Sequence, residues 1–278
     1  LLVSFARSGN SPESVAAVRL ADTFCKNCTH LIITCNGEGD LARYPTLSEK
    51  KVLVLSEEAN DRSLVMTSSY SGMLLAGMLL ARFDELEKME PVVRNMICYA
   101  RQFIERGAPL LRKMADMGFM RTVFLGSGCH SGTVKEASLK MQELTDGKIV
   151  SKDDSYLGFR HGPKAVINER TLLIYFLSSG NDYARRYEMD LIASMNEGTQ
   201  PMHQLCISET KTDSPAGFEC LYFSEKGNLT EDEWLSLCYI IPVQILGFYK
   251  SLELGLCPDK PSSNNDITRV VRGVHIYS

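Results

Sequence analysis

Three charged side chains at helical spacing are the strongest candidates for chemistry in this chain. Glu136, Lys140 and Glu143 follow one another at intervals of four and three residues, so a helix places them on one face. Two carboxylates and an ammonium, with an imidazole from His161 further along, are groups that move protons on a small polar substrate. The alternative is a solvated face with a salt bridge, which is the usual meaning of such a pattern. The helix also carries the apolar residues Val134, Ala137, Leu139 and Met141, which leave it little surface for water. This favours burial of the charged side chains, and charges on a buried helix indicate a function.

His161 lies in a rigid segment, Gly-Phe-Arg-His-Gly-Pro, in which glycines and a proline fix the direction of the backbone. The neighbouring Arg160 and Lys164 favour a neutral imidazole, which is useful for moving a proton near neutral pH. The alternative is a structural histidine whose hydrogen bonds are satisfied within the fold. Both interpretations are open from the residues alone.

A serine-rich turn, Arg-Ser-Gly-Asn-Ser-Pro at residues 7–12, follows the first predicted strand and opens a helix. The amides and the dipole at a helix start attract anions, and Ser8 and Ser11 add hydroxyl donors, so the turn is a candidate phosphate site. The alternative is a plain loop in which Ser11 only caps the helix. The later loop 126–132 is a weaker candidate, because it lacks the Lys-Ser/Thr ending of a P-loop and its third glycine is misplaced for a dinucleotide fingerprint.

Cys25, Cys28, His30 and Cys35 could in principle supply four zinc ligands. However, His30 and Cys35 bracket an apolar strand and would point away from a common centre. We therefore interpret these cysteines as core or surface thiols, and we predict neither a metal site nor a cofactor.

The elements that must position these residues alternate between short apolar strands and helical segments. This order predicts an α/β fold with parallel sheets that carry helices on both faces. Two similar strand-and-turn segments, SFARSGNS and YFLSSGND, indicate an internal duplication, and we place the units at residues 1–90 and 91–278. Strands are predicted at 1–5, 30–35, 51–56, 122–126, 148–151, 171–178, 203–208 and 219–224, and helices after Pro12 and at 68–83, 85–117 and 132–145.

The composition excludes several classes of protein. The 278 residues carry a formal charge of −4 without a run of basic residues, so a nucleic-acid partner is not expected. The most apolar stretch, 235–256, contains Pro242 and Lys250 and predicts a buried helix, not a membrane span. Nine scattered cysteines lack the spacing of a disulfide framework, which favours reduced thiols and a cytoplasmic location.

Taken together, several stretches resemble the sugar isomerase (SIS) domain proteins. The resemblance is closest to the double-SIS family of galactosamine-6-phosphate deaminase/isomerases, often labelled tagatose-6-phosphate ketose/aldose isomerases. It covers nearly the whole chain and implies two three-layer αβα units. The matching stretches are LLVSFARSGNSPESVAAVRLA, FLGSG, EASLKMQELTDGK, LGFRHGPKAVI, TLLIYFLS, RRYEMDLIA and ITRVVRGVHIY.

The resemblance also implies roles for particular residues. Glu143 would be the base that moves a proton between C2 and C1, and His161 would assist ring opening. Lys140 and Glu136 would hold sugar hydroxyls and tune Glu143. The phosphate group would sit on Arg7, Ser8 and Ser11. The isomerase domain of glucosamine-6-phosphate synthase shares the core pattern. In that synthase a neighbouring subunit contributes this histidine, so a homodimer with shared site residues is expected.

The implied reaction converts galactosamine 6-phosphate to tagatose 6-phosphate and ammonia. An enolamine and then a ketose imine would form, and hydrolysis of the imine would make the enzyme a hydrolase as well as an isomerase. Three alternatives are ketose–aldose isomerisation without deamination, a sugar-phosphate-sensing module and a purely structural dimerisation domain. Retention of Glu136, Lys140, Glu143 and His161 together favours the enzyme.

The chain departs from the family pattern at two places. A functional lysine near the C-terminus of the synthase corresponds to Arg272, for which only an electrostatic role is expected because arginine does not release its proton. Family members also begin about a hundred residues earlier, a length comparable to that of a typical domain. The first unit is therefore expected to be N-terminally incomplete, with an exposed sheet edge and weak sugar-phosphate binding.

Overall fold

The computed structural model describes residues 1–212, 218–229, 231–270 and 273–277. The chain forms two compact units, one of Leu1–Leu86 with Ser262–Ser278 and one of Glu87–Pro261. The C-terminal tail therefore groups with the first unit, whereas the sequence analysis assigned it to the second. Its contacts explain the grouping: the Arg269 guanidinium donates to Asn60 Oδ1 and to the Asp61 carbonyl.

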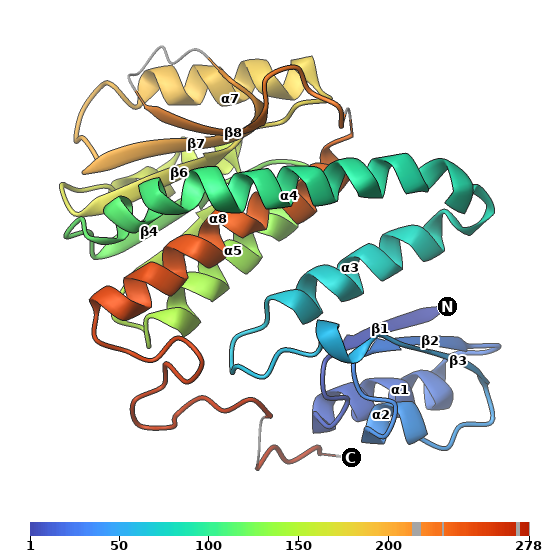
Figure 1. Cartoon of the computed structure of the whole chain (residues 1–278). Coiled ribbons are helices and arrows are strands. Elements are labelled where there is room, and N and C mark those ends of the chain that lie inside the picture. The colour runs from blue at the N-terminus through green and yellow to red at the C-terminus, as the bar shows by residue number, and fades with distance from the viewer. Residues whose placement is uncertain (213–217, 230, 271–272, 278) are drawn as a thin grey trace. The chain divides into compact units, whose positions relative to one another are not determined.

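The first unit is a three-layer αβα arrangement around a parallel sheet (Figure 1). One face of the sheet packs on α1 through the buried residues Val18, Ile32 and Leu41. On the other face α3 approaches closely, since a Cβ on Gly77 would lie 2.9 Å from Phe5 Cζ. The elements are β1 (Leu2–Ala6), α1 (Pro12–Phe24), β2 (Thr29–Thr34), α2 (Asp40–Arg43), β3 (Glu49–Val54), η1 (Glu57–Ala59), α3 (Ser68–Ala81) and η2 (Phe83–Glu85), with strand order β1-β2-β3.

Strand β1 lies at an edge of this sheet and pairs with β2 in the register Leu2 to His30. Val3 and Phe5 are exposed on this strand. An apolar strand at an edge offers unpaired backbone groups beside exposed apolar side chains, and both favour association with another chain segment.

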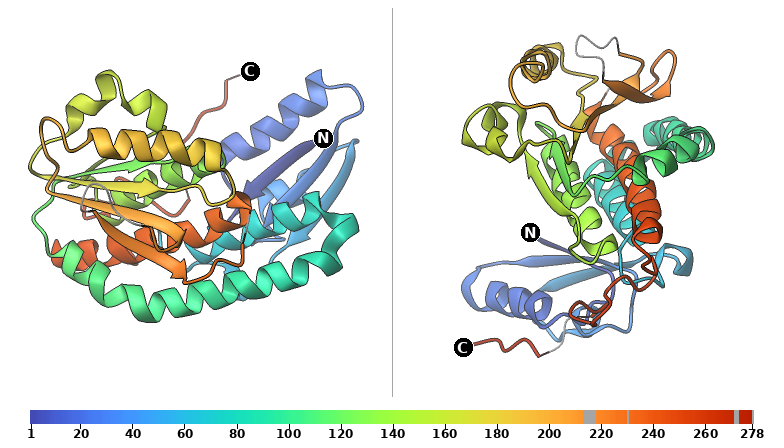
Figure 2. Two further views of the ribbon diagram at one scale, coloured as in Figure 1. Left: turned by 90° about the horizontal axis from the view of Figure 1, so that it is seen from above. Right: turned by 90° about the vertical axis from the view of Figure 1, so that its left-hand side faces the viewer.

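The second unit has a five-stranded parallel sheet in the order β5-β4-β6-β7-β8. Helix α7 covers one face, and α4, α5 and α8 cover the other (Figures 1 and 2). The elements are α4 (Leu86–Ala115), β4 (Arg121–Leu125), α5 (His130–Leu144), β5 (Val150–Asp154), α6 (Tyr156–Phe159), η3 (Gly162–Val166), β6 (Thr171–Phe176), α7 (Asp182–Ser194), β7 (His203–Thr210), β8 (Glu219–Ser224) and α8 (Asp232–Glu253).

The two faces of the central strand β6 carry separate parts of the core, because successive side chains of a strand alternate between faces. Tyr175 packs with Tyr156 and Leu191 on the α6–α7 side. On the α8 side the rings of Phe176 and Tyr239 pack edge to face, with 5.9 Å between their centroids. The predicted α/β class with parallel sheets is confirmed.

Helix α8 is the only helix of the described residues that is long and apolar enough to cross a membrane, but 67% of its most apolar window is buried inside the fold. The predicted buried helix at 235–256 is thus confirmed. Its Gly247 packs against α5: a Cβ there would lie 2.6 Å from Leu144 Cδ1. This close approach fixes the end of α5 that carries Glu143.

Candidate functional site

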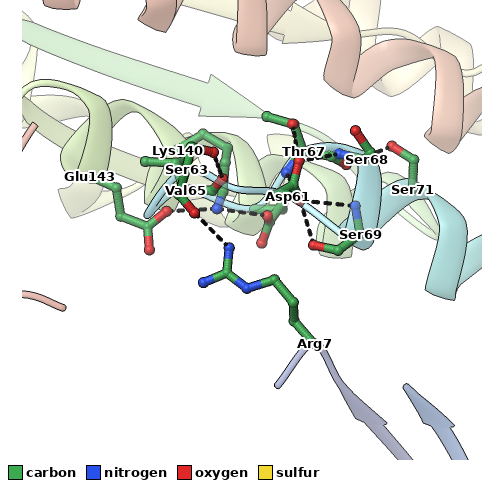
Figure 3. Close-up of polar contacts among 11 residues, drawn as sticks. Arg7, Asp61, Ser63, Val65, Thr67, Ser68, Ser69, Ser71, Lys140 and Glu143 are labelled. Atoms are coloured by element: carbon green, nitrogen blue, oxygen red, sulfur yellow. Dashed lines mark hydrogen bonds and ion pairs between the residues drawn. The ribbon is translucent and has the colours of Figure 1, made fainter. Parts of the chain in front are cut away.

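Helix α5 buries a charged cluster, which is the central feature of the second unit. Lys140 Nζ lies 2.6 Å from Glu143 Oε2 and 3.2 Å from Glu136 Oε1 (Figure 3 draws the first contact). The lysine is 1% exposed, and the two glutamate side chains are 16% and 24% exposed. The predicted clustering on one face is confirmed, and the alternative of a solvated face is excluded by this burial.

The two glutamates are not in equivalent settings. Burial raises the pKa of Glu136, and the nearby Lys140 ammonium opposes that rise. A carboxyl group whose pKa is raised by burial can exchange protons closer to neutral pH than an exposed one. Glu143 is the more exposed of the pair and lies in the last turn of the helix, so a small molecule can reach it.

Leu139 is more exposed than the sequence predicted. Leu139 is 45% exposed, although it was counted among the residues that bury the helix. Ala137, Val134 and Met141 are buried as predicted. Helix α5 packs against α8 and against the strands β4 and β5, and its coverage leaves Leu139 partly open to solvent.

The structure does not join His161 to the charged cluster. His161 is exposed and precedes η3, and among the described residues no hydrogen bond or ion pair joins its ring to Glu136, Lys140 or Glu143. The backbone around it is held by α7, since Lys164 Nζ donates to the Ser194 carbonyl. An exposed imidazole on a fixed segment is available to a second chain.

The predicted serine turn lies at the carboxyl end of β1 and leads into α1. Gly9 has φ +66°, a left-handed conformation that glycine adopts without strain. Ser8 Oγ accepts from the Asn10 amide, while Ser11 precedes α1 without a side-chain cap bond. The alternative of a serine retained only for capping is therefore not supported by the bonding of Ser11.

Arg7 is buried beneath this turn. Its guanidinium donates to the carbonyls of Ser63 and Arg269 (Figure 3 draws the Ser63 contact). Arg7 thus ties the turn to the loop before α3 and to the C-terminal tail, all within the first unit. Arg272, for which an electrostatic role was expected, lies outside the described residues.

Sequence reasoning missed a second polar cluster in the first unit, centred on Asp61. Its carboxylate accepts from the amides of Thr67 and Ser69 and from both hydroxyls (Figure 3). These hydrogen bonds outweigh the desolvation that opposes them and lower the pKa of Asp61 to about 2. The sequence carries no clear signal for this cluster, because Asp61 lies too far before the helix start at Ser68 to occupy the usual capping position.

Asp61→Asn is expected to lower the unfolding free energy of the first unit by about 1–3 kcal/mol, because an amide cannot accept all of these hydrogen bonds. The wild-type contribution should be fully present above about pH 4 and be lost as the pH falls toward 2, since the folded pKa lies below the unfolded value. Hydrogen exchange of the Ser68 and Ser69 amides would measure both effects. Asp84→Asn, at an exposed position, is the control; equal protection in Asp61→Asn and wild type would contradict this account.

The second serine loop, which resembles the first in sequence, is occupied by carboxylates of its own chain. Glu188 accepts from the Ser178 amide and hydroxyl, and Asp232 accepts from the amides of Ser179 and Gly180. The adjoining cavity of about 320 Å³ is lined in part by Glu231, Asp232 and Glu233. In the described residues, by contrast, no carboxylate accepts from the amides of Ser8–Ser11. The amides of the second loop are therefore already bonded to carboxylates, whereas those of the first loop, within the described residues, are not.

The cysteines near the N-terminus do not converge on a metal centre. Cys35 is buried, and its thiol donates a hydrogen bond to the Ala59 carbonyl, whereas Cys25 is exposed. His30 Nε2 lies 2.7 Å from Asp22 Oδ1, so this ring already has a carboxylate partner. In the part of the chain that the structure describes, no group of three or more His, Cys, Asp or Glu residues is arranged to hold a metal ion.

Comparisons with known proteins agree with this fold, although no protein-family model matches the chain. The D-galactosamine-6-phosphate deaminase AgaS of Shewanella sp. (strain ANA-3) is 37% identical over the whole chain, which spans 67% of that protein. The protein of the same name from Escherichia coli is 36% identical, and the chain spans 72% of it. The crystal structure of tagatose-6-phosphate ketose/aldose isomerase from Escherichia coli superposes with a TM-score of 0.87 at 32% identity, covering 100% of this chain and 71% of that one.

The parallel αβα units and the similarity to this solved structure place the chain in the class of SIS-type phosphosugar isomerase folds. Within that class, the chain belongs to the D-galactosamine-6-phosphate deaminase AgaS family.

These relatives correct one expectation about the reaction class. They are named as a deaminase and as a ketose/aldose isomerase, and neither name describes the hydrolase that the sequence analysis included.

Proposed function

We propose that this chain is an amino-sugar-phosphate deaminase/isomerase that converts galactosamine 6-phosphate to tagatose 6-phosphate and ammonia. The observation that carries the proposal is the buried contact of Lys140 with Glu143 and Glu136 in a member of the AgaS family. A lysine held between two carboxylates can stabilise charge on a substrate while one carboxylate moves a proton.

Glu143 is the base that removes the proton from C2 and gives an enolamine. Return of the proton to C1 gives the imine of the ketose, water adds to the imine carbon, and ammonia leaves. The Lys140 ammonium donates to the sugar oxygens on which negative charge develops. Glu136 holds a sugar hydroxyl and sets the charge around Lys140; its raised pKa and its 3.2 Å contact with Lys140 support this role.

The phosphate group is assigned to the serine turn, with Ser8 and Ser11 as hydroxyl donors. The support is that the amides of this turn have no carboxylate partner among the described residues, whereas those of the related loop do. Arg7 adds positive charge beneath the turn and fixes its position through the Ser63 carbonyl. No step of this reaction requires a metal or a cofactor.

A cytoplasmic homo-oligomer is the proposed form of the enzyme, with His161 acting on the substrate of a neighbouring copy. His161 is exposed, and within the described residues its ring makes no hydrogen bond or ion pair with Glu143; both observations support this assignment. Within its own chain, His161 lies on a segment that α7 holds in place.

The test is a coupled assay for ammonia with galactosamine 6-phosphate, together with detection of tagatose 6-phosphate. Both products should appear in equal amounts. The matched control is N-acetylgalactosamine 6-phosphate, whose amide nitrogen should not be released. Interconversion of hexose phosphates without ammonia would favour the isomerase alternative, and absence of any turnover would contradict the proposal.

A further inference from the structure

Two cysteines occupy directly paired positions in the second unit, away from the charged cluster of α5. Cys206 of β7 and Cys220 of β8 are register partners in adjacent parallel strands. Both pack against the same core cluster on the α6–α7 side of the sheet, so their side chains are on one face. Cys206 is fully buried, and Cys220 is partly exposed on the edge strand.

The surroundings of Cys220 favour its thiolate. A hydrogen bond from Cys206 is the largest cause that lowers the pKa of the Cys220 thiol, to about 6, and burial opposes it. Ser208 Oγ lies 3.4 Å from Cys220 Sγ and also lowers its pKa. Burial raises the pKa of Cys206, so this thiol keeps its proton. A thiolate beside a protonated thiol is the arrangement of an attacking and a resolving cysteine.

We propose that Cys206 and Cys220 are a redox-active pair, a modification site at which hydrogen peroxide converts the two thiols to a disulfide. The Cys220 thiolate attacks the peroxide oxygen, which gives a sulfenic acid and releases hydroxide. The Cys206 sulfur then attacks the Cys220 sulfur, the S–O bond breaks, and the proton of Cys206 leaves with the hydroxide as water. Two thiols are oxidised by two electrons and one peroxide is reduced to two waters.

The strand geometry permits this bond. Neighbouring strands lie about 4.7–4.9 Å apart, within the range of about 4.4–6.8 Å between Cα atoms that a disulfide spans. Because β8 is hydrogen-bonded only to β7 among the described strands, it can shift slightly to bring the sulfurs together. The bond would tie the edge strand to the interior of the sheet.

Trypsin makes the test direct, since cleavage after Arg186, Lys211 and Lys226 places Cys206 and Cys220 in separate peptides with no other cysteine. The whole protein is treated with a small excess of hydrogen peroxide, alkylated under denaturing conditions, digested and analysed by mass spectrometry without reductant. The expected product is peptide 187–211 linked to peptide 212–226, at the summed mass less two hydrogens. Dithiothreitol should separate them.

Cys220→Ser should abolish the linked product and leave Cys206 alkylated. Cys98→Ser removes an exposed thiol elsewhere and should leave the linked product unchanged. The proposal is overturned if Cys98 is oxidised while both peptides remain separate and alkylated, or if Cys220 is linked to a cysteine other than Cys206. Because none of these residues belongs to the proposed ammonia-releasing site, failure here would leave that assignment intact.

Discussion

Replacing Glu143 with glutamine is expected to lower kcat for ammonia release by about 10²–10⁴-fold, the range that one general base contributes. The amide keeps the size of the side chain and can still accept a hydrogen bond from Lys140, 2.6 Å away in the wild type. It cannot take the C2 proton. KM should therefore change little, and steady-state kinetics on galactosamine 6-phosphate would separate the two parameters.

The chain offers a matched control for this variant in α8. Lys250 and Glu253 form the same i,i+3 pair at 2.7 Å, and this lysine is as buried as Lys140. Glu253→Gln should leave kcat unchanged. If Glu143→Gln retains wild-type turnover, Glu143 is not the base; if Glu253→Gln loses as much, the effect reports disturbed packing.

Lys140→Met is expected to lower kcat by about 10²–10³-fold, the loss typical when one preorganised donor to a developing oxyanion is removed. The substitution also leaves Glu136 and Glu143 next to each other without their shared cation. We expect the unfolding free energy near neutral pH to fall by about 1–3 kcal/mol. This loss should shrink toward pH 5, because the pKa of Glu136 is already raised and its neutral form needs no cation.

Lys250→Met is the control for the lysine. Its ammonium donates to the carbonyls of Ala115 and Met117 at the end of α4, so its loss should also destabilise the second unit. It should not change kcat measured at a temperature where the variant is folded. Urea unfolding at several pH values, followed by kinetics, compares the two variants. Unchanged kcat in Lys140→Met would contradict the role of Lys140.

The sequence predicted the parts of the fold that depend on local pattern. The mainly apolar run predicted at 171–178 forms strand β6 (Thr171–Phe176), which is buried at every position. The i, i+4, i+7 spacing predicted the contacts of Lys140 because helix geometry alone brings those positions together. Strand β5 was displaced: it begins at Val150, not Lys148, since Asp146 and Gly147 adopt positive φ and extend the turn after α5.

The remaining features depend on contacts between distant residues, which no local pattern encodes. Asp232 reaches the Ser179 amide across 53 positions, and Arg269 reaches Asn60 across 209. The Asp61 cluster was missed because its partners lie six to eight residues away, beyond helical and strand periods. The exposed position of His161 could not be read from its neighbours either, since it depends on how the segment packs against α7.

The carboxylates in the second serine loop have a consequence for binding stoichiometry. An incoming phosphate ester would have to displace Asp232 from two amides and then face Glu231 and Glu233 at the same cavity. The negative charges of the phosphate and of these carboxylates would repel each other strongly in a cavity from which water is partly excluded. The two loops are similar in sequence, but we expect only the first to bind a phosphate group. Saturation with sugar phosphate should therefore end at one equivalent per chain, along a single hyperbola.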